Sequence, residues 1–401
     1  MSDFLHGVRE TLRTTCLTLA AAATFAAFGA SASAQDFQTA AQQALLMDEV
    51  TGAILYAKNI DEPMVPASMT KVMTVAVIVD EMRKGRLSET TEFTVSEDAW
   101  RRGGAPSRGS TMFAEIGSRI ALPDLLRGII VHSGNDAAIA AAEGIAGSEQ
   151  AFARMMTNYG RSIGMRVSEF RNATGFHDPE QVTTARELAL LARHLIEEAP
   201  EIWAIFGEEE FTWNGIRQRN RFPLLGMNIG AEGGKTGFVT ESGHGLVGSA
   251  VQNDQRLIVV VNGLPSEAAR ATESRRLVEW GFRAFERRRL FEPGEEIGRA
   301  QVFGGESAHV PLVSGRPVEV LFPRGTNERL SARIVYEGPL RPPVEAGTPV
   351  GFLRVTRGDT VVLEAPLETG ASVPQGPLTR RAMDGAWELV SGGVRRAIWG
   401  E

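Results

Sequence analysis

The chain has 401 residues, enough for two domains that each have their own hydrophobic core. With 43% hydrophobic and 23% charged residues its composition is that of a globular protein, which excludes a largely disordered or low-complexity chain. The formal net charge of -7 excludes nucleic acid as the main partner, because no basic excess is available to neutralise phosphates.

The N-terminus has the pattern of a secretory signal peptide over residues 1–34. An apolar run, "CLTLAAAATFAAFG", is followed by small residues that place Ala32 and Ala34 at the A-x-A positions, so we expect cleavage after Ala34. An uncleaved N-terminal anchor is the alternative, although the run is short for a bilayer span. The single cysteine, Cys16, lies in this run. The mature chain would therefore have no disulfide, cysteine nucleophile or thiolate metal site.

The mature chain begins with two apolar runs that flank residues 48–52, which predicts a β-hairpin. A helix is expected from 67 to 84, ending before Gly85. Apolar residues then recur at the helical period in four segments, 122–132, 135–147, 149–164 and 184–199.

Strand patterns return at 235–240, 244–252 and 255–264, and a helix is expected over 267–289. Strands at both ends of the region therefore enclose a helical insert. The simplest arrangement is an α+β domain over residues 35–289, in which one antiparallel sheet is covered by helices.

Residues 290–296 are interpreted as a linker to a second, all-β domain over 290–375, because short β-rich runs alternate there with turn residues. The tail, 376–401, mixes arginines with Trp387 and Trp399. Such an amphipathic tail either lies on an anionic membrane surface or packs against its own domain.

Ser68 and Lys71 are the first candidate catalytic pair, because residues three apart share one face of a helix. The chain has only four lysines, at positions 58, 71, 84 and 235. A buried lysine near a helix N-terminus has a lowered pKa and can remove the proton of a serine hydroxyl, whereas arginine cannot be deprotonated. The alternative is a lysine whose stem packs while its ammonium group reaches solvent.

A second motif, Ser133-Gly134-Asn135, falls between two expected helices. The serine hydroxyl is suited to relaying protons and the Asn135 amide to holding a substrate backbone. Alternatively, Asn135 or Asp136 caps the following helix.

A third motif, Lys235-Thr236-Gly237, begins an expected strand. An ammonium group beside a hydroxyl suits a small carboxylate, and Gly237 lets a ligand backbone come close. Alternatively, this is an edge strand whose lysine discourages aggregation.

Together the three motifs, S-x-x-K, S-x-N and K-T-G in this order, are those of penicillin-recognising serine enzymes. The whole mature chain resembles the low-molecular-mass penicillin-binding proteins, which are serine-type D-alanyl-D-alanine carboxypeptidases (peptidase S11 family). The segments that carry the resemblance include "PASMTKVMT", "DLLRGIIVHSGNDA", "RNATGFHDP" and "GGKTGFVTESGHGLVGSA". The resemblance implies a β-lactamase-like fold and a β-rich second domain, and a reaction that needs no metal or organic cofactor.

The resemblance also implies roles for individual residues. Ser68 matches the acyl-enzyme nucleophile and Lys71 its activating base. Ser133 matches the residue that passes protons, and Asn135 the residue that grips the substrate amide.

On the strand, Lys235 and Thr236 match the residues that receive the substrate carboxylate, and Gly237 completes their motif. The backbone N–H groups of Ser68 and Phe238 match an oxyanion hole. Arg270 falls where the family has an arginine near the site. Arg221 matches another family arginine, although here Phe222 follows it in place of the usual asparagine.

The activity implied is removal of the terminal D-alanine from peptidoglycan stem pentapeptides, with β-lactams acylating Ser68 as substitutes for the substrate. The implied location is the periplasm, with the tail as a candidate for peripheral contact with the inner membrane. Three alternatives remain open: a serine β-lactamase, a DD-endopeptidase that cuts crosslinks, and a catalytically idle protein that binds the cell wall.

Overall fold

The computed structural model describes residues 37–324, 329–358, 360–379 and 381. The predicted signal peptide, Cys16 and residues 380 and 382–401 of the predicted amphipathic tail lie outside the described residues. In the part of the chain that is described, no helix combines the length and apolar character needed to cross a membrane.

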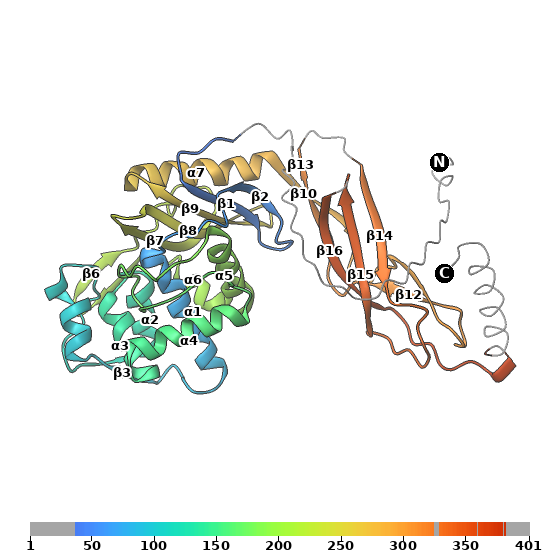
Figure 1. Ribbon diagram of the computed structural model, residues 1–401, viewed down its shortest axis with the longest axis horizontal. Helices are drawn as coiled ribbons and strands as arrows, with labels where there is room; N and C mark the ends of the chain where they lie inside the picture. Colours follow the sequence, from blue (N-terminus) through green and yellow to red (C-terminus); the bar gives the residue numbers. More distant parts are fainter. Residues whose placement is uncertain (1–36, 325–328, 359, 380, 382–401) are drawn as a thin grey trace. The chain divides into compact units, whose positions relative to one another are not determined.

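The first part of the chain, from Gln43 to Ala284, is built around a five-stranded antiparallel sheet in the order β2-β1-β9-β8-β7 (Figure 1). Its first hairpin pairs with a strand more than two hundred residues later, which confirms the prediction of one sheet built from both ends of the region. The strands are β1 (Gln43–Asp48), β2 (Ile54–Lys58), β7 (Ala231–Val239), β8 (Gly243–Gln252) and β9 (Gln255–Leu264).

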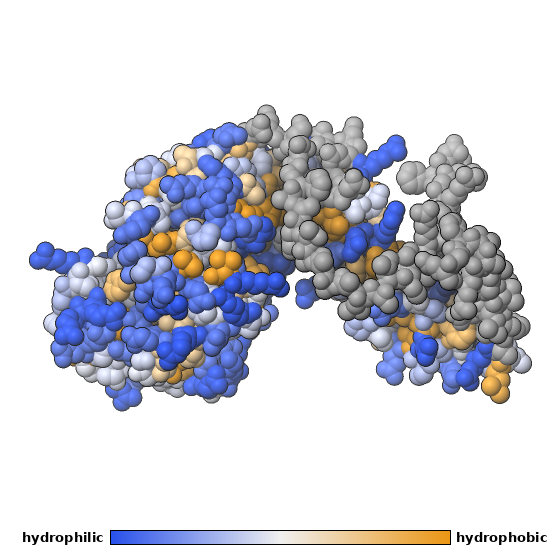
Figure 2. Space-filling model, in the orientation of Figure 1, coloured by the Kyte–Doolittle hydropathy of each residue, from blue (hydrophilic) through white to orange (hydrophobic). Residues whose placement is uncertain are grey.

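Helices cover both faces of this sheet, which explains why its central strands are apolar without alternation. Leu45 and Met47 pack into the core under α1–α6, whereas Leu46, between them, packs into the core under α7. Most of the visible surface over the helices is hydrophilic (Figure 2). The helices are α1 (Thr70–Arg83), α2 (Leu122–Ile130), α3 (Asn135–Ala146), α4 (Glu149–Ser162), α5 (Ala185–Glu198), α6 (Pro200–Ile205) and α7 (Glu267–Ala284).

Several short elements were not expected. They are the ribbons β3 (Glu92–Thr94) with β4 (Arg119–Ala121) and β5 (Glu210–Trp213) with β6 (Ile216–Arg219), the helix α6, the short helical turn η3 (Ala105–Ser107), and the π-helical turn η2 (Ala99–Gly103). The helix expected from 67 begins as a separate short turn, η1 (Ala67–Met69).

The helix expected over 267–289 is wrong at its C-terminal end. It stops at Ala284, and β10 (Phe285–Phe291) follows and pairs with β13 (Val318–Pro323). The sequence "FERRRLF" supports either structure, and the strand forms because β13 satisfies its backbone hydrogen bonds. The linker expected over 290–296 therefore begins inside a strand.

The second part is all-β, as expected. Its sheet has the order β11-β12-β16-β15-β14. A separate core is built from residues between Ala300 and Val373. The strands are β11 (Gly298–Gln301), β12 (His309–Val313), β14 (Leu330–Tyr336), β15 (Pro349–Arg357) and β16 (Thr360–Thr369).

Candidate active site

Ser68 lies in the 3-10 turn η1 and Lys71 in the first turn of α1. The single helix predicted over this segment is therefore two helical pieces joined at Met69. Helix α1 is apolar on all sides because it runs through the core between other helices, so Lys71 is 0% exposed. The alternative of a lysine that reaches solvent is wrong.

The Lys71 amine has three hydrogen-bond partners. It donates to Asn135 Oδ1 at 2.7 Å and to the Thr174 carbonyl at 2.5 Å, and it lies 3.2 Å from Ser68 Oγ. Two of these partners can only accept hydrogen bonds, whereas the serine hydroxyl can also donate one. A neutral amine has two N–H donors and one lone pair, so this set of partners leaves the lone pair for the Ser68 proton.

The pKa of Lys71 is lowered from 10.5 to about 7, first by burial and then by the positive charge of Arg221, while the carboxylates of Asp136 and Glu149 oppose the shift. A buried ammonium group loses its hydration, which disfavours the charged form. Near neutral pH about half of the enzyme therefore has the neutral amine that can accept a proton.

The Ser133–Asn135 motif lies at the start of α3. Asn135 is the first residue of the helix and neither it nor Asp136 caps it, because the cap position is Gly134. The Asp136 carboxylate instead accepts hydrogen bonds from Thr111 Oγ1 at 2.6 Å and from the backbone of Met112 and Ala114. These contacts fix the helix start, and with it Asn135. Ser133 is 2% exposed and has a positive φ of 57°.

The Lys235–Gly237 motif lies on β7, which is an edge strand of the sheet. A Cβ at Gly237 would lie 2.9 Å from the Pro66 carbonyl oxygen and 3.1 Å from the Ala67 Cβ. The missing side chain therefore lets β7 pack directly against the turn that carries Ser68.

Lys235 is 3% exposed, and its amine donates to the Thr236 carbonyl at 3.2 Å. Its pKa lies well below 10.5 because of burial, followed by repulsion from Lys71, Arg221 and Arg270. Since these neighbouring charges are all positive, a bound carboxylate would restore the ammonium form of this lysine.

Two arginines complete the positively charged side of the site. Arg270, on α7, is 5% exposed. Arg221 donates to Ser110 Oγ at 2.6 Å. The next residue, Phe222, is 2% exposed and its ring packs against β7 and β8, where a Cβ at Gly248 would lie 2.4 Å from it. The departure from the family asparagine thus provides an apolar anchor for Arg221.

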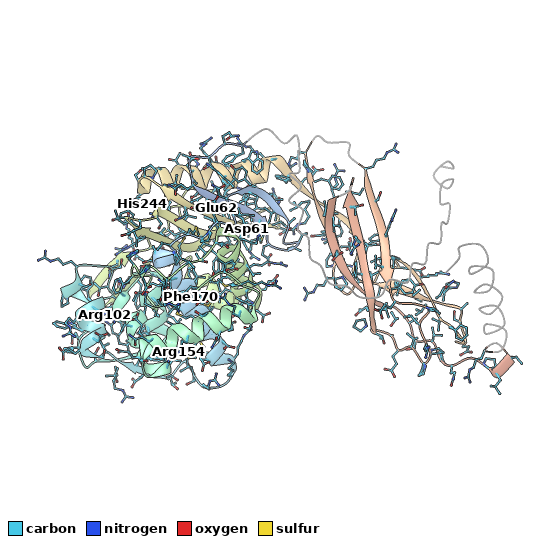
Figure 3. The ribbon with its side chains drawn as sticks, in the orientation of Figure 1. Asp61, Glu62, Arg102, Arg154, Phe170 and His244 are labelled. Atoms are coloured by element: carbon cyan, nitrogen blue, oxygen red, sulfur yellow. The ribbon has the colours of Figure 1, made fainter. Side chains whose placement is uncertain are left out.

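Phe238 follows the third motif on β7. Its side chain is 55% exposed and stacks on His244 of β8 with ring centroids 4.2 Å apart (Figure 3 labels His244). The backbone, rather than the side chain, is the part assigned to the oxyanion hole.

The segment 172–176 contributes to the site although sequence reasoning gave it no role. Thr174 supplies the carbonyl that accepts from Lys71. The adjacent Gly175 has a φ of +83°, and a Cβ there would lie 1.9 Å from the Ala67 carbonyl oxygen. The glycine in "RNATGFHDP" was the one available signal, because a close approach of two backbones requires glycine.

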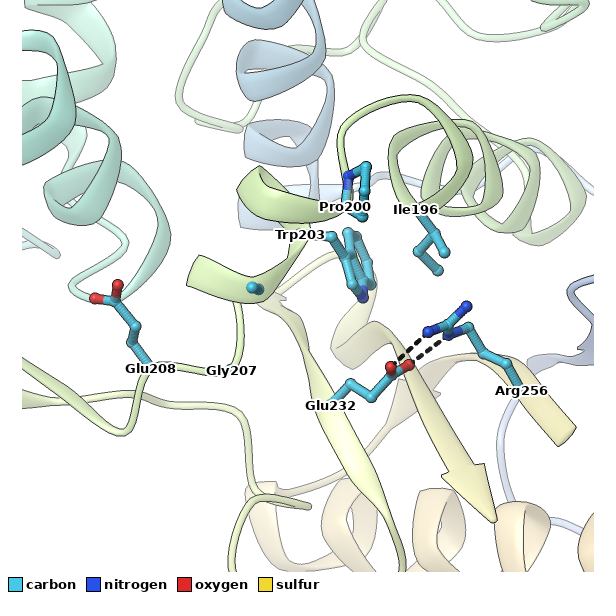
Figure 4. A pocket seen from close by; sticks show the side chains of 8 residues that line it. Ile196, Pro200, Trp203, Gly207, Glu208, Glu232 and Arg256 are labelled. Atoms are coloured by element: carbon cyan, nitrogen blue, oxygen red, sulfur yellow. Dashed lines mark hydrogen bonds and ion pairs between the residues drawn. The ribbon is translucent and has the colours of Figure 1, made fainter. Parts of the chain in front are cut away.

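A hollow near α6 lies among other residues. It is lined by Trp203, Glu232 and Arg256, among others, and none of the predicted catalytic residues contributes to it (Figure 4). Glu232 and Arg256 pair with each other at 2.8 Å, and Ser249 Oγ donates to Glu232 at 2.7 Å. These polar groups are already paired, so the hollow offers no evident site for a polar ligand.

Known proteins match both parts of the chain. The family model for D-alanyl-D-alanine carboxypeptidase matches residues 29–266, and the model for the C-terminal domain of penicillin-binding protein 5 matches residues 285–375. D-alanyl-D-alanine carboxypeptidase DacC of Escherichia coli K12 is 37% identical over 361 residues, which cover 89% of this chain and 90% of the relative.

Among solved structures, penicillin-binding protein 5 of Haemophilus influenzae matches with a TM-score of 0.77 and 34% identity, covering 85% of this chain and 99% of that one. Penicillin-binding protein D2 of Listeria monocytogenes, in its ampicillin-bound form, matches with a TM-score of 0.53 and 26% identity over 62% of this chain and 99% of that one. The α+β fold and the resemblance inferred from the three motifs are confirmed, and the chain belongs to the D-alanyl-D-alanine carboxypeptidase family.

Proposed function

We propose that this serine-type D-alanyl-D-alanine carboxypeptidase works through Ser68 as nucleophile and neutral Lys71 as general base. The observation that carries the proposal is the set of partners around the Lys71 amine. Two acceptors can take both N–H groups of the neutral amine, which leaves its lone pair for the Ser68 hydroxyl, 3.2 Å away. General-base activation of a serine requires this geometry.

In the proposed reaction, the proton of Ser68 passes to Lys71 Nζ while Oγ attacks the carbonyl carbon between two D-alanines. The backbone N–H groups of Ser68 and Phe238 stabilise the resulting oxyanion. The C–N bond then breaks, and the leaving amine takes a proton from Lys71 directly or through Ser133. Water hydrolyses the ester and releases the shortened peptide.

The buried basic side chains explain why the enzyme acts at the C-terminal end of the stem peptide. Burial, followed by the positive charges of Lys71, Arg221 and Arg270, lowers the pKa of Lys235, so a bound anion stabilises the charged form of this lysine. The terminal carboxylate of a stem pentapeptide supplies this anion, and Thr236 adds a hydroxyl donor. A β-lactam has a carboxylate and a reactive carbonyl, and on this proposal it acylates Ser68 in place of the peptide.

Labelling with a fluorescent penicillin tests the nucleophile. Ser68→Ala should abolish covalent labelling, whereas Ser88→Ala, on an exposed loop, should leave it unchanged. Persistent labelling of folded Ser68→Ala would refute the assignment.

Incubation with muropeptides separates this function from its rivals. Loss of one alanine from a pentapeptide supports carboxypeptidase action, and cleavage of crosslinked dimers supports endopeptidase action. Rapid multiple turnover of penicillin would favour a β-lactamase, and a folded protein that releases no D-alanine would favour an idle wall-binding protein.

We also propose a periplasmic location, with export through residues 1–34 and membrane association through the basic, tryptophan-containing tail 376–401. The mass of the exported protein should correspond to cleavage after Ala34. Deletion of residues 382–401 should move the protein from the membrane fraction to the soluble periplasmic fraction, and unchanged fractionation would refute the role of the tail.

A further inference from the structure

Glu149 is a buried carboxylate that the catalytic mechanism does not use. It is the first residue of α4 and is 5% exposed. Oε1 accepts from the backbone N–H of Ala173 at 3.1 Å, and Oε2 accepts from the Arg102 guanidinium at 2.9 Å (Figure 3 labels Arg102). Each oxygen of the carboxylate therefore has a partner on a different segment of the chain.

The first of these partners adjoins the general base. Ala173 precedes Thr174, whose carbonyl accepts from Lys71. The Ala173 carbonyl in turn accepts from Thr74 Oγ1 at 2.7 Å, and Thr74 lies three residues after Lys71 on α1. Glu149 and Thr74 therefore hold Ala173 by its N–H and its carbonyl, and this fixes the direction of the next carbonyl in the chain.

The second partner leads to the other acceptor of Lys71. Arg102 belongs to η2 and also donates to Asp98 at 2.8 Å. A Cβ at the neighbouring Gly103 would lie 2.3 Å from the backbone nitrogen of Asp136, so η2 packs tightly on the start of α3. Asn135 begins that helix. The Arg102–Glu149 ion pair thus links the segments that supply both acceptors of the lysine amine.

We propose that Glu149, held by Arg102, is a positioning residue for proton transfer. It fixes the Thr174 carbonyl on the Lys71 amine and places a negative charge near that amine. The inference rests on the proposed role of Lys71 as general base.

The charges around Lys71 come from several elements. Arg221, which follows β6, lowers its pKa, whereas Asp136 of α3 and Glu149 of α4 raise it. Lys235 of β7 is a further neighbour, and the charge of Lys71 contributes to lowering its pKa after burial. Within this set Glu149 opposes the effect of burial, and Arg102 partly neutralises Glu149. Removing Glu149 and removing Arg102 should therefore have opposite effects.

The test is the pH dependence of acylation by a fluorescent penicillin, measured between about pH 5 and pH 9 in the full chain. Glu149→Gln keeps an acceptor for the Ala173 N–H but loses the charge. It should keep the maximal rate. The acid limb of the profile, defined by the lower pH at which the acylation rate falls to half of its maximum, should move down by roughly half to one pH unit. Arg102→Met should move the limb in the opposite direction. Glu149→Ala also loses the acceptor, and its maximal rate should fall by roughly tenfold.

Glu81→Gln is the matched control. Glu81 is 4% exposed and pairs with Arg86, but it lies ten residues beyond Lys71 on α1, about 15 Å along the helix. Its substitution removes a buried paired carboxylate without touching segment 172–176. The acid limb should stay where it is.

Acid limbs that do not move, or that move in the same direction in Glu149→Gln and Arg102→Met, would overturn the proposal. Wild-type acylation by Glu149→Ala would do the same, and if that variant does not fold, the other two variants decide. Labelling of Ser68→Ala or Lys71→Arg would instead refute the proposed function. The two failures are therefore distinguishable.

Discussion

The amine of Lys71 shows how the surroundings of one residue select its chemistry. Burial removes water from the ammonium group, and the Asn135 amide oxygen and Thr174 carbonyl then hold the amine in place. The same two acceptors would also bind a charged donor, so hydrogen bonding alone does not make the lysine a base. Burial together with the nearby Arg221 is what lowers its pKa.

Replacing Lys71 with arginine separates charge from basicity. We expect Lys71→Arg to lose penicillin acylation by a factor of roughly 10³ or more, because a guanidinium group does not release its proton at neutral pH. Lys84→Arg, at the exposed C-terminal end of the same helix, is the matched control and should acylate normally. Comparable acylation by both variants would show that Lys71 is not the base.

The rate of acylation should follow the titration of Lys71. Its pKa of about 7 means that the amine is protonated, and unable to accept the Ser68 proton, at lower pH. The second-order rate constant should therefore fall about tenfold per pH unit below roughly pH 6 and level off above pH 8. Stopped-flow measurements with a chromogenic β-lactam would reveal this profile. A rate that stays constant from pH 5 to pH 8 would contradict the prediction.

At the scale of single residues, the sequence identified the candidate catalytic side chains but not all the groups that they contact. The three motifs identified Ser68, Lys71 and Asn135, and the structure joins them by hydrogen bonds. The contact of Asn135 with the base was not foreseen, because the amide was expected to bind substrate. The Thr174 contact was missed because it uses a backbone carbonyl 103 residues away. Every residue has a backbone carbonyl, so the sequence does not show which one contacts the lysine.

Between elements, the approach of segment 172–176 to η1 depends on one missing side chain. Gly175 lies against the backbone of Ala67, immediately before the nucleophile. Because backbone atoms cannot move aside as a flexible side chain does, any Cβ at this position must displace one of the two segments. Both segments carry groups that contact Lys71.

Gly175→Ala should therefore impair acylation by more than tenfold and destabilise the protein by about 2 kcal/mol or more. Gly85→Ala is the control for backbone strain alone, because Gly85 also has a positive φ, +70°, but has open space around its Cβ position. It should cost about 1 kcal/mol with normal acylation. Denaturant unfolding and penicillin labelling measure the two effects. Equal acylation by both variants would contradict the steric argument.

Helices and strands were predicted correctly where the sequence shows one clear hydrophobic pattern. The central strands of the main sheet, β1, β8 and β9, are largely buried, and apolar residues recur at the helical period in most of the helices that cover them. The strand β10 was missed because "FERRR" continues the helix before it without a break in composition. Its pairing with β13, about thirty residues later, decided the structure.

At the scale of the whole molecule, the residues assigned to catalysis belong to one of the two parts matched by family models. The chain from Gln43 to Ala284 forms the main sheet and its helices, and it contains every residue proposed to act in the reaction. The all-β part has its own core between Ala300 and Val373. A part with its own core can unfold as a separate cooperative unit.

Acylation should therefore stabilise one unit and not the other. Scanning calorimetry of the full chain should show two unfolding transitions, and after reaction with a slowly hydrolysed β-lactam only one should move. Binding to the native state alone raises the apparent stability of the unit that contains the site. Ser68→Ala, treated with the same β-lactam, should lose this covalent shift, which assigns the moving transition to the part with the nucleophile. A single transition that shifts as a whole would show instead that the two cores unfold together.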